Sequence, residues 1–166
     1  MKADLGFETF LEKNIFPFWA RLYRVQAFKW NLPYRLIYDP RLKINIPRRC
    51  EKTGCDYFLA INGRLGFLEV KRTGKPRLAI VKSTDDPGLA WHQISFLAEH
   101  ETGGRFAAVL WECCKKDYLI PISAVIRILE ETGKRSINVK EVKEYQVGDL
   151  VNFWEEHWDV QGKVAQ

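Results

Sequence analysis

Residues 55–71 read CDYFLAINGRLGFLEVK and contain two apolar, β-rich runs on either side of an Asn-Gly pair. This dipeptide is the strongest short-range signal for a β-hairpin, because a type I′ turn needs positive φ at both central positions. With Asn62-Gly63 as the turn, Ile61 faces Arg64, and every further facing pair can be counted outward from there. Both faces of the hairpin are apolar, which predicts strands covered by helices on both sides.

Three charged residues gather at the open end of this hairpin. The register places Asp56 directly across from Glu69, with Lys71 on the same face two residues further along. Two opposed carboxylates repel each other unless a cation neutralises them or one keeps its proton. A divalent metal resolves the conflict, and Mg²⁺ takes one or two carboxylates together with water and phosphate oxygens. The alternative is that Asp56 ends its strand in solvent while Glu69 and Lys71 form an ordinary surface pair.

The composition indicates one globular domain over residues 1–166. Hydrophobic residues make up 46% of the chain and charged residues 28%, which is ordinary for a domain with its own core. No apolar run approaches the ~20 residues of a membrane span, and the first residues lack the layout of a signal peptide. We therefore expect a soluble, cytoplasmic protein with no membrane partner.

The net charge of +5 is divided unevenly. Residues 1–83 hold 17 Lys and Arg against 7 acids, whereas residues 84–166 hold 9 against 14. Within the basic half, residues 64–82 carry six basic side chains and Glu69 as their one acid. A basic surface suggests a polyanionic partner, and acids at its centre suit metal-dependent hydrolysis of that polyanion.

The rest of the chain predicts an α/β arrangement with a mixed sheet. Pro17 should kink or split the first helix, and residues 39–54 should form an exposed basic loop. The expected helices cover residues 4–25, 86–102, 121–132 and 149–158; the expected strands outside the hairpin cover residues 34–38, 105–111, 117–120 and 139–145.

The four cysteines do not show the paired spacing of a zinc site. Cys50 and Cys55 are separated by four residues, and Cys113 and Cys114 are adjacent. Neighbouring residues of a strand point to opposite faces, so the adjacent pair is not expected to act together. We interpret the cysteines as structural thiols, with a zinc-bound interaction domain as the less favoured alternative.

Six short motifs occur in order within roughly residues 30–145. They are Thr53-Gly54-Cys55-Asp56-Tyr57, Phe67-Leu68-Glu69-Val70-Lys71, His92-Gln93-Ile94, Gly103-Gly104-Arg105-Phe106-Ala107, Tyr118-Leu119-Ile120-Pro121 and Gly133-Lys134-Arg135-Ser136-Ile137. The Asp with the Glu-x-Lys resembles the PD-(D/E)xK nuclease superfamily. The whole set is similar to Holliday-junction resolvases of the recombination-protein-U type.

The resemblance implies a restriction-endonuclease-like fold, a central mixed sheet flanked by helices. It implies a metal-dependent endodeoxyribonuclease that uses Mg²⁺, with Mn²⁺ as an alternative metal, and resolves four-way DNA junctions as a homodimer. In such enzymes the residues matching Asp56 and Glu69 hold the metal, the residue matching Gln93 completes its shell, and the residue matching Lys71 stabilises the transition state.

An N-terminal helical Glu often completes sites of this family. Glu8 and Glu12 lie four residues apart on one helix face, so both remain candidates, and Glu8 better resembles the family's helix pattern. The family also places a metal-linked Thr two residues before its Asp. Gly54 stands at that position here and Thr53 one residue further back, so the sequence departs from the family's pattern at this ligand.

The basic residues around the hairpin are candidates for phosphate contacts, which position a duplex without reading its sequence. They are Arg48, Arg49, Arg72, Lys75 and Arg77, and for each the alternative is a solvated basic surface. Two other functions remain open: a different structure-specific or restriction-type endonuclease with the same site, and a catalytically silent DNA-binding module on the same fold.

Overall fold

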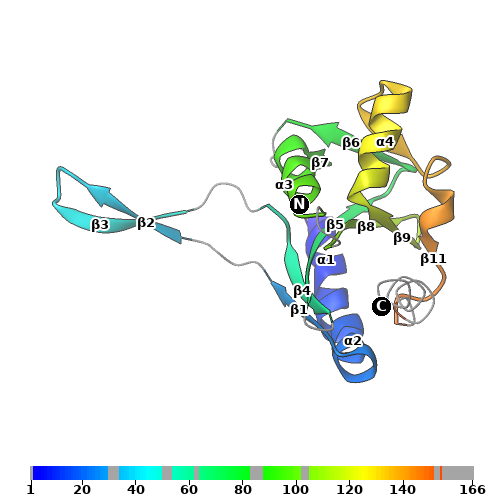
Figure 1. Cartoon of the computed structure of the whole chain (residues 1–166), viewed down its shortest axis with the longest axis horizontal. Coiled ribbons are helices and arrows are strands. Elements are labelled where there is room, and N and C mark those ends of the chain that lie inside the picture. The colour runs from blue at the N-terminus through cyan, green and yellow to red at the C-terminus, as the bar shows by residue number, and fades with distance from the viewer. Residues whose placement is uncertain are drawn as a thin grey trace.

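A six-stranded sheet forms the centre of the computed structural model, which describes residues 2–29, 34–49, 54–61, 64–82, 88–101, 105–151 and 154. In spatial order its strands are β1 (Val25–Lys29), β4 (Tyr57–Ile61), β5 (Arg64–Thr73), β8 (Phe106–Cys113), β9 (Lys116–Pro121) and β11 (Gln146–Val147). β5 and β8 run parallel, and the other neighbours are antiparallel (Figure 1). The predicted α/β class with a mixed sheet is confirmed.

The β4–β5 hairpin has the predicted register. Tyr57 pairs with Leu68 and Ile61 with Arg64, so one further step outward brings Asp56 opposite Glu69. The turn pair 62–63 lies outside the described residues. β5 is longer than β4 and continues beside β8 to Thr73. The two strands of the hairpin therefore separate at the point where Asp56 and Glu69 meet.

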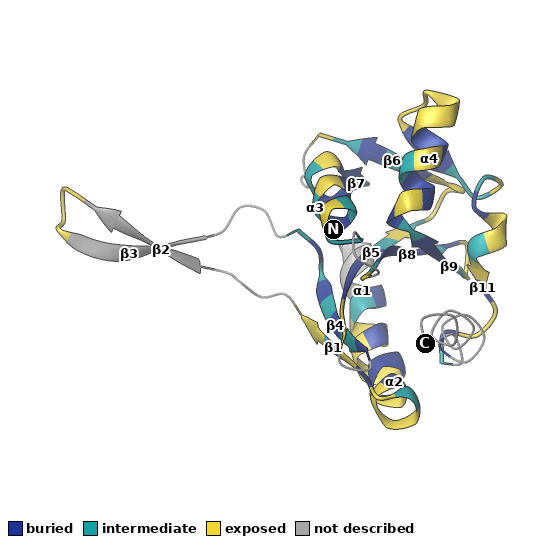
Figure 2. Ribbon diagram, in the orientation of Figure 1, coloured by how far each residue is buried: buried dark blue, intermediate teal, exposed yellow. Residues whose placement is uncertain are grey.

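Helices cover both faces of the sheet. α1 (Lys2–Phe10), a π-helical turn (Leu11–Ile15) and α2 (Phe16–Tyr23) pack on the face that buries Leu59 and Leu110. α3 (Trp91–Glu101) and α4 (Ile122–Thr132) pack on the face that buries Phe67 and Trp111. Figure 2 shows the buried sides of these helices turned to the sheet and their exposed sides turned outward. Within the described ranges, no helix is long and apolar enough to cross a membrane.

Pro17 divides the N-terminal helix as predicted. A proline lacks the backbone N–H, and its ring crowds the carbonyl four residues earlier. The turn before it, Leu11–Ile15, is π-helical, and α2 resumes with Pro17 in its first turn. Two residues further along α2, the indole Nε1 of buried Trp19 donates a hydrogen bond to the Leu150 carbonyl oxygen over 2.6 Å.

Residues 34–49 form a separate hairpin. β2 (Tyr34–Asp39) agrees with the strand expected over 34–38 and pairs antiparallel with β3 (Ile44–Arg49). Figure 1 shows this pair well to one side of the central sheet. The prediction of a loop over 39–54 is therefore wrong for residues 44–49. Pro47 suggested a loop, but both strands of a two-stranded sheet are edges, where a missing N–H is tolerated.

The helix expected over 86–102 begins later than predicted. β7 (Leu89–Ala90) pairs with β6 (Arg77–Val81), which also pairs with β10 (Ser136–Asn138) in a small three-stranded sheet. Because residues 89–90 are used in this sheet, α3 starts at Trp91. Asp86 and Pro87, the predicted start, lie outside the described residues.

The strand expected over 139–145 is not formed. β10 ends at Asn138, whose backbone N–H donates to the Glu141 carboxylate over 2.8 Å and whose Oδ1 accepts from Lys140 N–H over 3.1 Å. Such local side-chain bonds favour a turn over a strand. A 3₁₀ turn (Lys143–Tyr145) and β11 follow. The helix expected over 149–158 lies largely outside the described residues, whereas β8, β9 and α4 agree with their predictions.

Because β5 is a central strand, replacing two of its leucines should change the free energy of unfolding by different amounts. Leu68 is fully buried, and Leu65 is 43% exposed. Leu68→Ala should lower the free energy of unfolding by about 2–5 kcal/mol, because it removes buried methyl groups and leaves a cavity. Leu65→Ala should cost less than about 1 kcal/mol. Denaturant unfolding measures both, and equal losses would contradict this placement of β5.

Candidate metal centre

Asp56 lies at the fork between β4 and β5. It directly precedes β4, and its Oδ2 accepts a hydrogen bond from the backbone N–H of Val70 over 2.8 Å. A backbone N–H that has no strand partner needs another acceptor, and the carboxylate of Asp56 supplies it. The side chain that stands where the hairpin opens is thereby fixed against β5.

Glu69 is a fully buried carboxylate on β5. Its Oε1 lies 2.7 Å from the ammonium Nζ of Lys71 and accepts a hydrogen bond from the side-chain Nε2 of Gln93 on α3. Its Oε2 is buried too, and no hydrogen-bond donor in the described ranges reaches it. Two donors therefore converge on one oxygen of Glu69, and the other oxygen is left without any.

The two carboxyl groups cannot both be ionised at low cost. Burial raises the pKa of Glu69 well above its usual value, the Asp56 charge raises it further, and Lys71 opposes both effects. Burial also raises the pKa of Asp56 to about 6, against the lowering influence of Lys71 and the Val70 amide. One ammonium for a buried and a partly buried carboxylate leaves either a proton or a second cation to be bound here.

These groups fit a hard divalent cation. Mg²⁺ prefers oxygen ligands and usually keeps several waters, so one or two carboxylates suffice. Oε2 of Glu69 and the carboxylate of Asp56 offer such ligands, and a divalent charge would neutralise both. In the described part of the chain, no three His, Cys, Asp or Glu side chains form a cluster that could hold a metal ion. The remaining ligands would therefore be amide, backbone or water oxygens.

Gln93 joins this site to the start of α3. Its Oε1 accepts the backbone N–H of Ala90 over 2.9 Å, the way a Gln in a first helical turn satisfies an N-terminal amide. Its Nε2 donates to Glu69. Gln93 was predicted to be a metal ligand, and the structure does place it at the site, but with a donor and not an oxygen toward Glu69. Coordination through Oε1 would require the amide to turn over and release Ala90.

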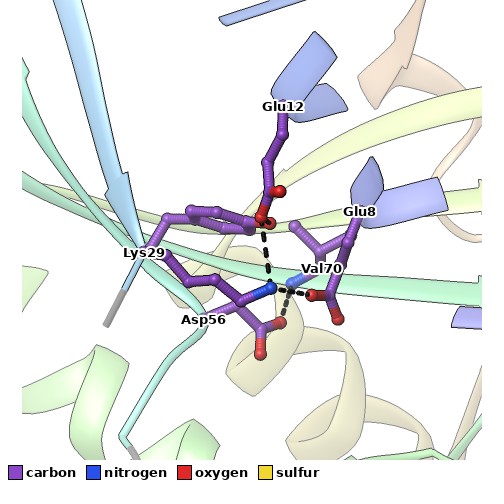
Figure 3. Close-up of polar contacts among 6 residues, drawn as sticks. Glu8, Glu12, Lys29, Asp56 and Val70 are labelled. Atoms are coloured by element: carbon purple, nitrogen blue, oxygen red, sulfur yellow. Dashed lines mark hydrogen bonds and ion pairs between the residues drawn. The ribbon is translucent and has the colours of Figure 1, made fainter. Parts of the chain in front are cut away.

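Glu8 and Glu12 both approach the site from the N-terminal helical segment (Figure 3). Lys29 connects them, with its Nζ 2.9 Å from Oε2 of Glu8 and 3.1 Å from Oε1 of Glu12. The Glu8 side chain is 18% exposed and that of Glu12 is 40% exposed. The charge of Glu8 is also among the causes that raise the pKa of Asp56. The arrangement therefore favours Glu8 as the acid that completes the site.

Two residues of this region were missed from the sequence. Lys29 ends β1 and Tyr57 begins β4, where they form a facing pair. The Tyr57 hydroxyl donates to Oε1 of Glu12 over 2.7 Å. No local pattern joins residues so far apart in the chain, because the pairing of β1 with β4 depends on the fold of the residues between them.

Glycine at position 54, where the resemblance would place a Thr, has a steric reason. A Cβ added to Gly54 would lie 2.2 Å from the ring of Phe96 on α3. Phe96 in turn packs against Phe67 and His100, with ring centroids 5.4 and 4.1 Å away. An aromatic side chain therefore fills the space that a side chain at position 54 would need.

The candidate phosphate contacts belong to three different parts of the molecule. Arg48 and Arg49 are residues of β3. Arg72 alternates with Lys71 on β5, so it lies on the opposite face of the sheet, and its Nε is 3.3 Å from Oε2 of Glu112. Lys75 and Arg77 are exposed just after β5. Of these five, Lys75 and Arg77 are exposed cations in the segment that leads from β5 to β6.

The cysteines show no zinc site in the described residues. Cys55 and Cys113 are buried, Cys114 is exposed, and Cys50 lies outside the described residues. Cys113 and Cys114 do not point to opposite faces, since their sulfur atoms are 3.6 Å apart. The strand alternation ends at Cys113 because Cys114, with φ of 53°, begins the turn to β9.

No family model matches the chain. A comparison with the sequences of curated proteins also found no match. The similarity to junction resolvases therefore stays a prediction that depends on the motifs and on the geometry of the site.

Removing the charge of Asp56 should stabilise the metal-free protein at neutral pH. The pKa of Asp56 is about 6 in the folded state, against an ordinary value of 3.8. The folded protein therefore holds an extra proton between these values, and stability is lost as the pH rises through them. We expect Asp56→Asn to raise the free energy of unfolding by about 3 kcal/mol at pH ~7.5 and by almost nothing below pH ~4. Denaturant unfolding in EDTA measures the difference.

Asp117 provides a matched control for this experiment. Burial and the neighbouring Glu112 also raise its pKa to about 6, and it lies on β9, away from the site. Asp117→Asn should stabilise the metal-free protein similarly, but only Asp56→Asn should abolish the stabilisation that added Mg²⁺ gives the wild type. Equal stabilisation of wild type and Asp56→Asn by Mg²⁺ would show that Asp56 does not hold the metal.

Gly54→Thr should destabilise the protein by about 1–3 kcal/mol, because the new side chain overlaps the Phe96 ring. In a Phe96→Ala background the same change should cost less than about 0.5 kcal/mol, since the obstructing ring is gone. A double-mutant cycle by denaturant unfolding tests this. Additive costs would mean that Phe96 is not the reason for glycine at this position.

Proposed function

We propose that the protein is a Mg²⁺-dependent endodeoxyribonuclease with a restriction-endonuclease-like fold. The observation that carries the proposal is the acid pair at the β4–β5 fork, in which Glu69 is buried and Asp56 partly buried. Asp56 and Glu69 face each other, and Lys71 reaches Glu69 over 2.7 Å from the same strand. Holding two acids together here lowers the stability of the fold. Such a cost is typical of a site that binds a divalent cation.

The residues would divide the chemistry between them. Asp56 and Glu69 would hold the metal ion, with Mn²⁺ able to replace Mg²⁺, and the ion would supply a Lewis acid at the scissile phosphodiester. Gln93 keeps Glu69 oriented from the side of α3. The Lys71 side chain is 15% exposed, so its ammonium can donate both to Glu69 and to a water or phosphate oxygen at the mouth of the site.

DNA is proposed as the substrate because the basic residues lie in the half of the chain that contains the site. Lys75 and Arg77 are exposed directly after β5, and Arg41 and Lys43 are exposed between β2 and β3. Such cations bind a phosphate backbone without regard to sequence. The four-way junction as preferred substrate and the homodimer are supported by the resemblance of the motifs to junction resolvases.

Cleavage of synthetic DNA tests this function. In Mg²⁺ the wild type should cut a four-way junction, and Asp56→Ala, Glu69→Ala and Lys71→Ala should each lower the rate at least ~100-fold while DNA affinity in Ca²⁺ stays within a few-fold. The measurement is the cleavage rate of end-labelled junctions, together with a binding titration.

Asp117→Asn is the control, since it alters a partly buried acid outside the site and should cleave like the wild type. Flap and linear DNA digested in parallel separate a resolvase from another structure-specific or restriction-type enzyme. Wild-type cleavage by Asp56→Ala would contradict the assigned site. DNA binding without any metal-dependent nicking would identify a silent binding module.

A further inference from the structure

Lys29 is the residue through which β1 contacts both N-terminal acids. Its ammonium lies 2.9 Å from Glu8 and 3.1 Å from Glu12. Tyr57 stands opposite Lys29 in the β1–β4 ladder, and its hydroxyl donates to the same Oε1 of Glu12 that Lys29 contacts. Figure 3 shows Glu8, Glu12 and Lys29 together with Asp56. The hydrolysis proposed above uses neither Lys29 nor Tyr57.

These contacts cannot be explained by the stability they provide. The side chains of Lys29 and Glu12 are each 40% exposed, and ion pairs of such exposure contribute little to folding. Glu8 and Glu12 are also like charges four residues apart in one helical segment, which is mildly unfavourable without a cation between them. Stability is therefore a weak reason to place three charged side chains here.

The contacts of Lys29 and Tyr57 determine how the side chains of Glu8 and Glu12 are oriented. A Glu side chain has several staggered rotamers available, and ordering it costs entropy. Lys29 engages Oε2 of Glu8, the less exposed of the two acids. Tyr57 is buried and holds Glu12, which in turn fixes the far side of the Lys29 ammonium. These contacts form a network that connects Tyr57 on β4, through Glu12 and Lys29, to Oε2 of Glu8.

Glu8 brings this network to the candidate metal site, since Figure 3 shows its carboxylate beside Asp56. Tyr57 directly follows Asp56, so the strand residue that holds Glu12 is the chain neighbour of a proposed metal ligand. We infer that Lys29 is a positioning residue of the nuclease site, which holds the carboxylate of Glu8 toward Asp56. This inference rests on the proposed function. Lys29 acts through Glu8 and touches neither the metal nor the scissile phosphate.

A double-mutant cycle between Lys29→Met and Glu8→Gln tests the inference with the full chain, Mg²⁺ and a synthetic four-way junction. Lys29→Met should lower kcat about tenfold and leave KM within about twofold, because Glu8 must then be ordered during each turnover. In the Glu8→Gln protein, Lys29→Met should have little further effect. Lys29→Arg keeps the charge and the donors and should restore most of the rate. Lys13→Met, which removes an exposed lysine of the same helical segment, should match the wild type.

A second measurement does not depend on cleavage. Three-bond NMR couplings of Glu8 in the metal-free protein should report one rotamer in the wild type and in Lys29→Arg, and rotamer averaging in Lys29→Met. Thermal midpoints close to that of the wild type show that each variant is folded.

Additive effects on kcat, or a Glu8 rotamer that Lys29→Met leaves unchanged, would overturn the inference. A wild-type protein without any metal-dependent cleavage would instead refute the proposed function. In that case the NMR couplings still decide whether Lys29 fixes Glu8.

Discussion

The burial of the Glu69 carboxylate is the constraint on which the rest of the site depends. Its side chain is inaccessible to solvent in a central strand, where an uncompensated charge costs several kcal/mol. The compensation comes from two elements, since Lys71 stands on the same strand and Gln93 on α3. A second acid, Asp56, faces Glu69, so the site contains one more negative charge than Lys71 can compensate. β4, β5 and α3 are thus arranged around a charge imbalance that the described protein groups do not remove by themselves.

Gln93 shows how this constraint also affects the fold. Its two amide atoms have separate partners, Ala90 N–H at the start of α3 and Glu69 in the sheet. The helix can satisfy its first amide in this way only when it begins next to Ala90, after β7 has paired with β6. The position at which α3 starts and the orientation of Glu69 are therefore determined by one side chain. This explains why a helix start argued from local residues alone was placed too early.

The sequence predicts the parts of the site that depend on local geometry. A two-residue turn determines its hairpin register, so the opposition of Asp56 and Glu69 can be counted outward from Asn62-Gly63 alone. The split of the first helix follows in the same way from the missing N–H of Pro17. The role of Lys29 could not be predicted, because it needs β1 beside β4. The hydrogen bonds of Gln93 needed the packing of α3 on β5. Residues 44–49 were misjudged because a proline was given more weight than their alternating isoleucines.

A second pair of acids in the same sheet shows what distinguishes the Asp56–Glu69 pair. Glu112 of β8 faces Asp117 of β9, and burial raises the pKa of Asp117 to about 6, as it does for Asp56. Arg72 stands beside Glu112 in the β5–β8 ladder, 3.3 Å from its Oε2, and its side chain is 41% exposed. A flexible guanidinium at the surface can neutralise the partly accessible Glu112, whereas Oδ1 of Asp117, like Oε2 of Glu69, is buried with no hydrogen-bond donor in the described residues. At Glu69 the acid is inaccessible, and its cation and its amide donor both contact the same oxygen. The two pairs share their cross-strand geometry and one buried oxygen without a donor in the described part of the chain, and they differ in that only the first pair contains an acid that is fully inaccessible, Glu69. Complete burial of one acid, and not the presence of two acids alone, therefore distinguishes the candidate site.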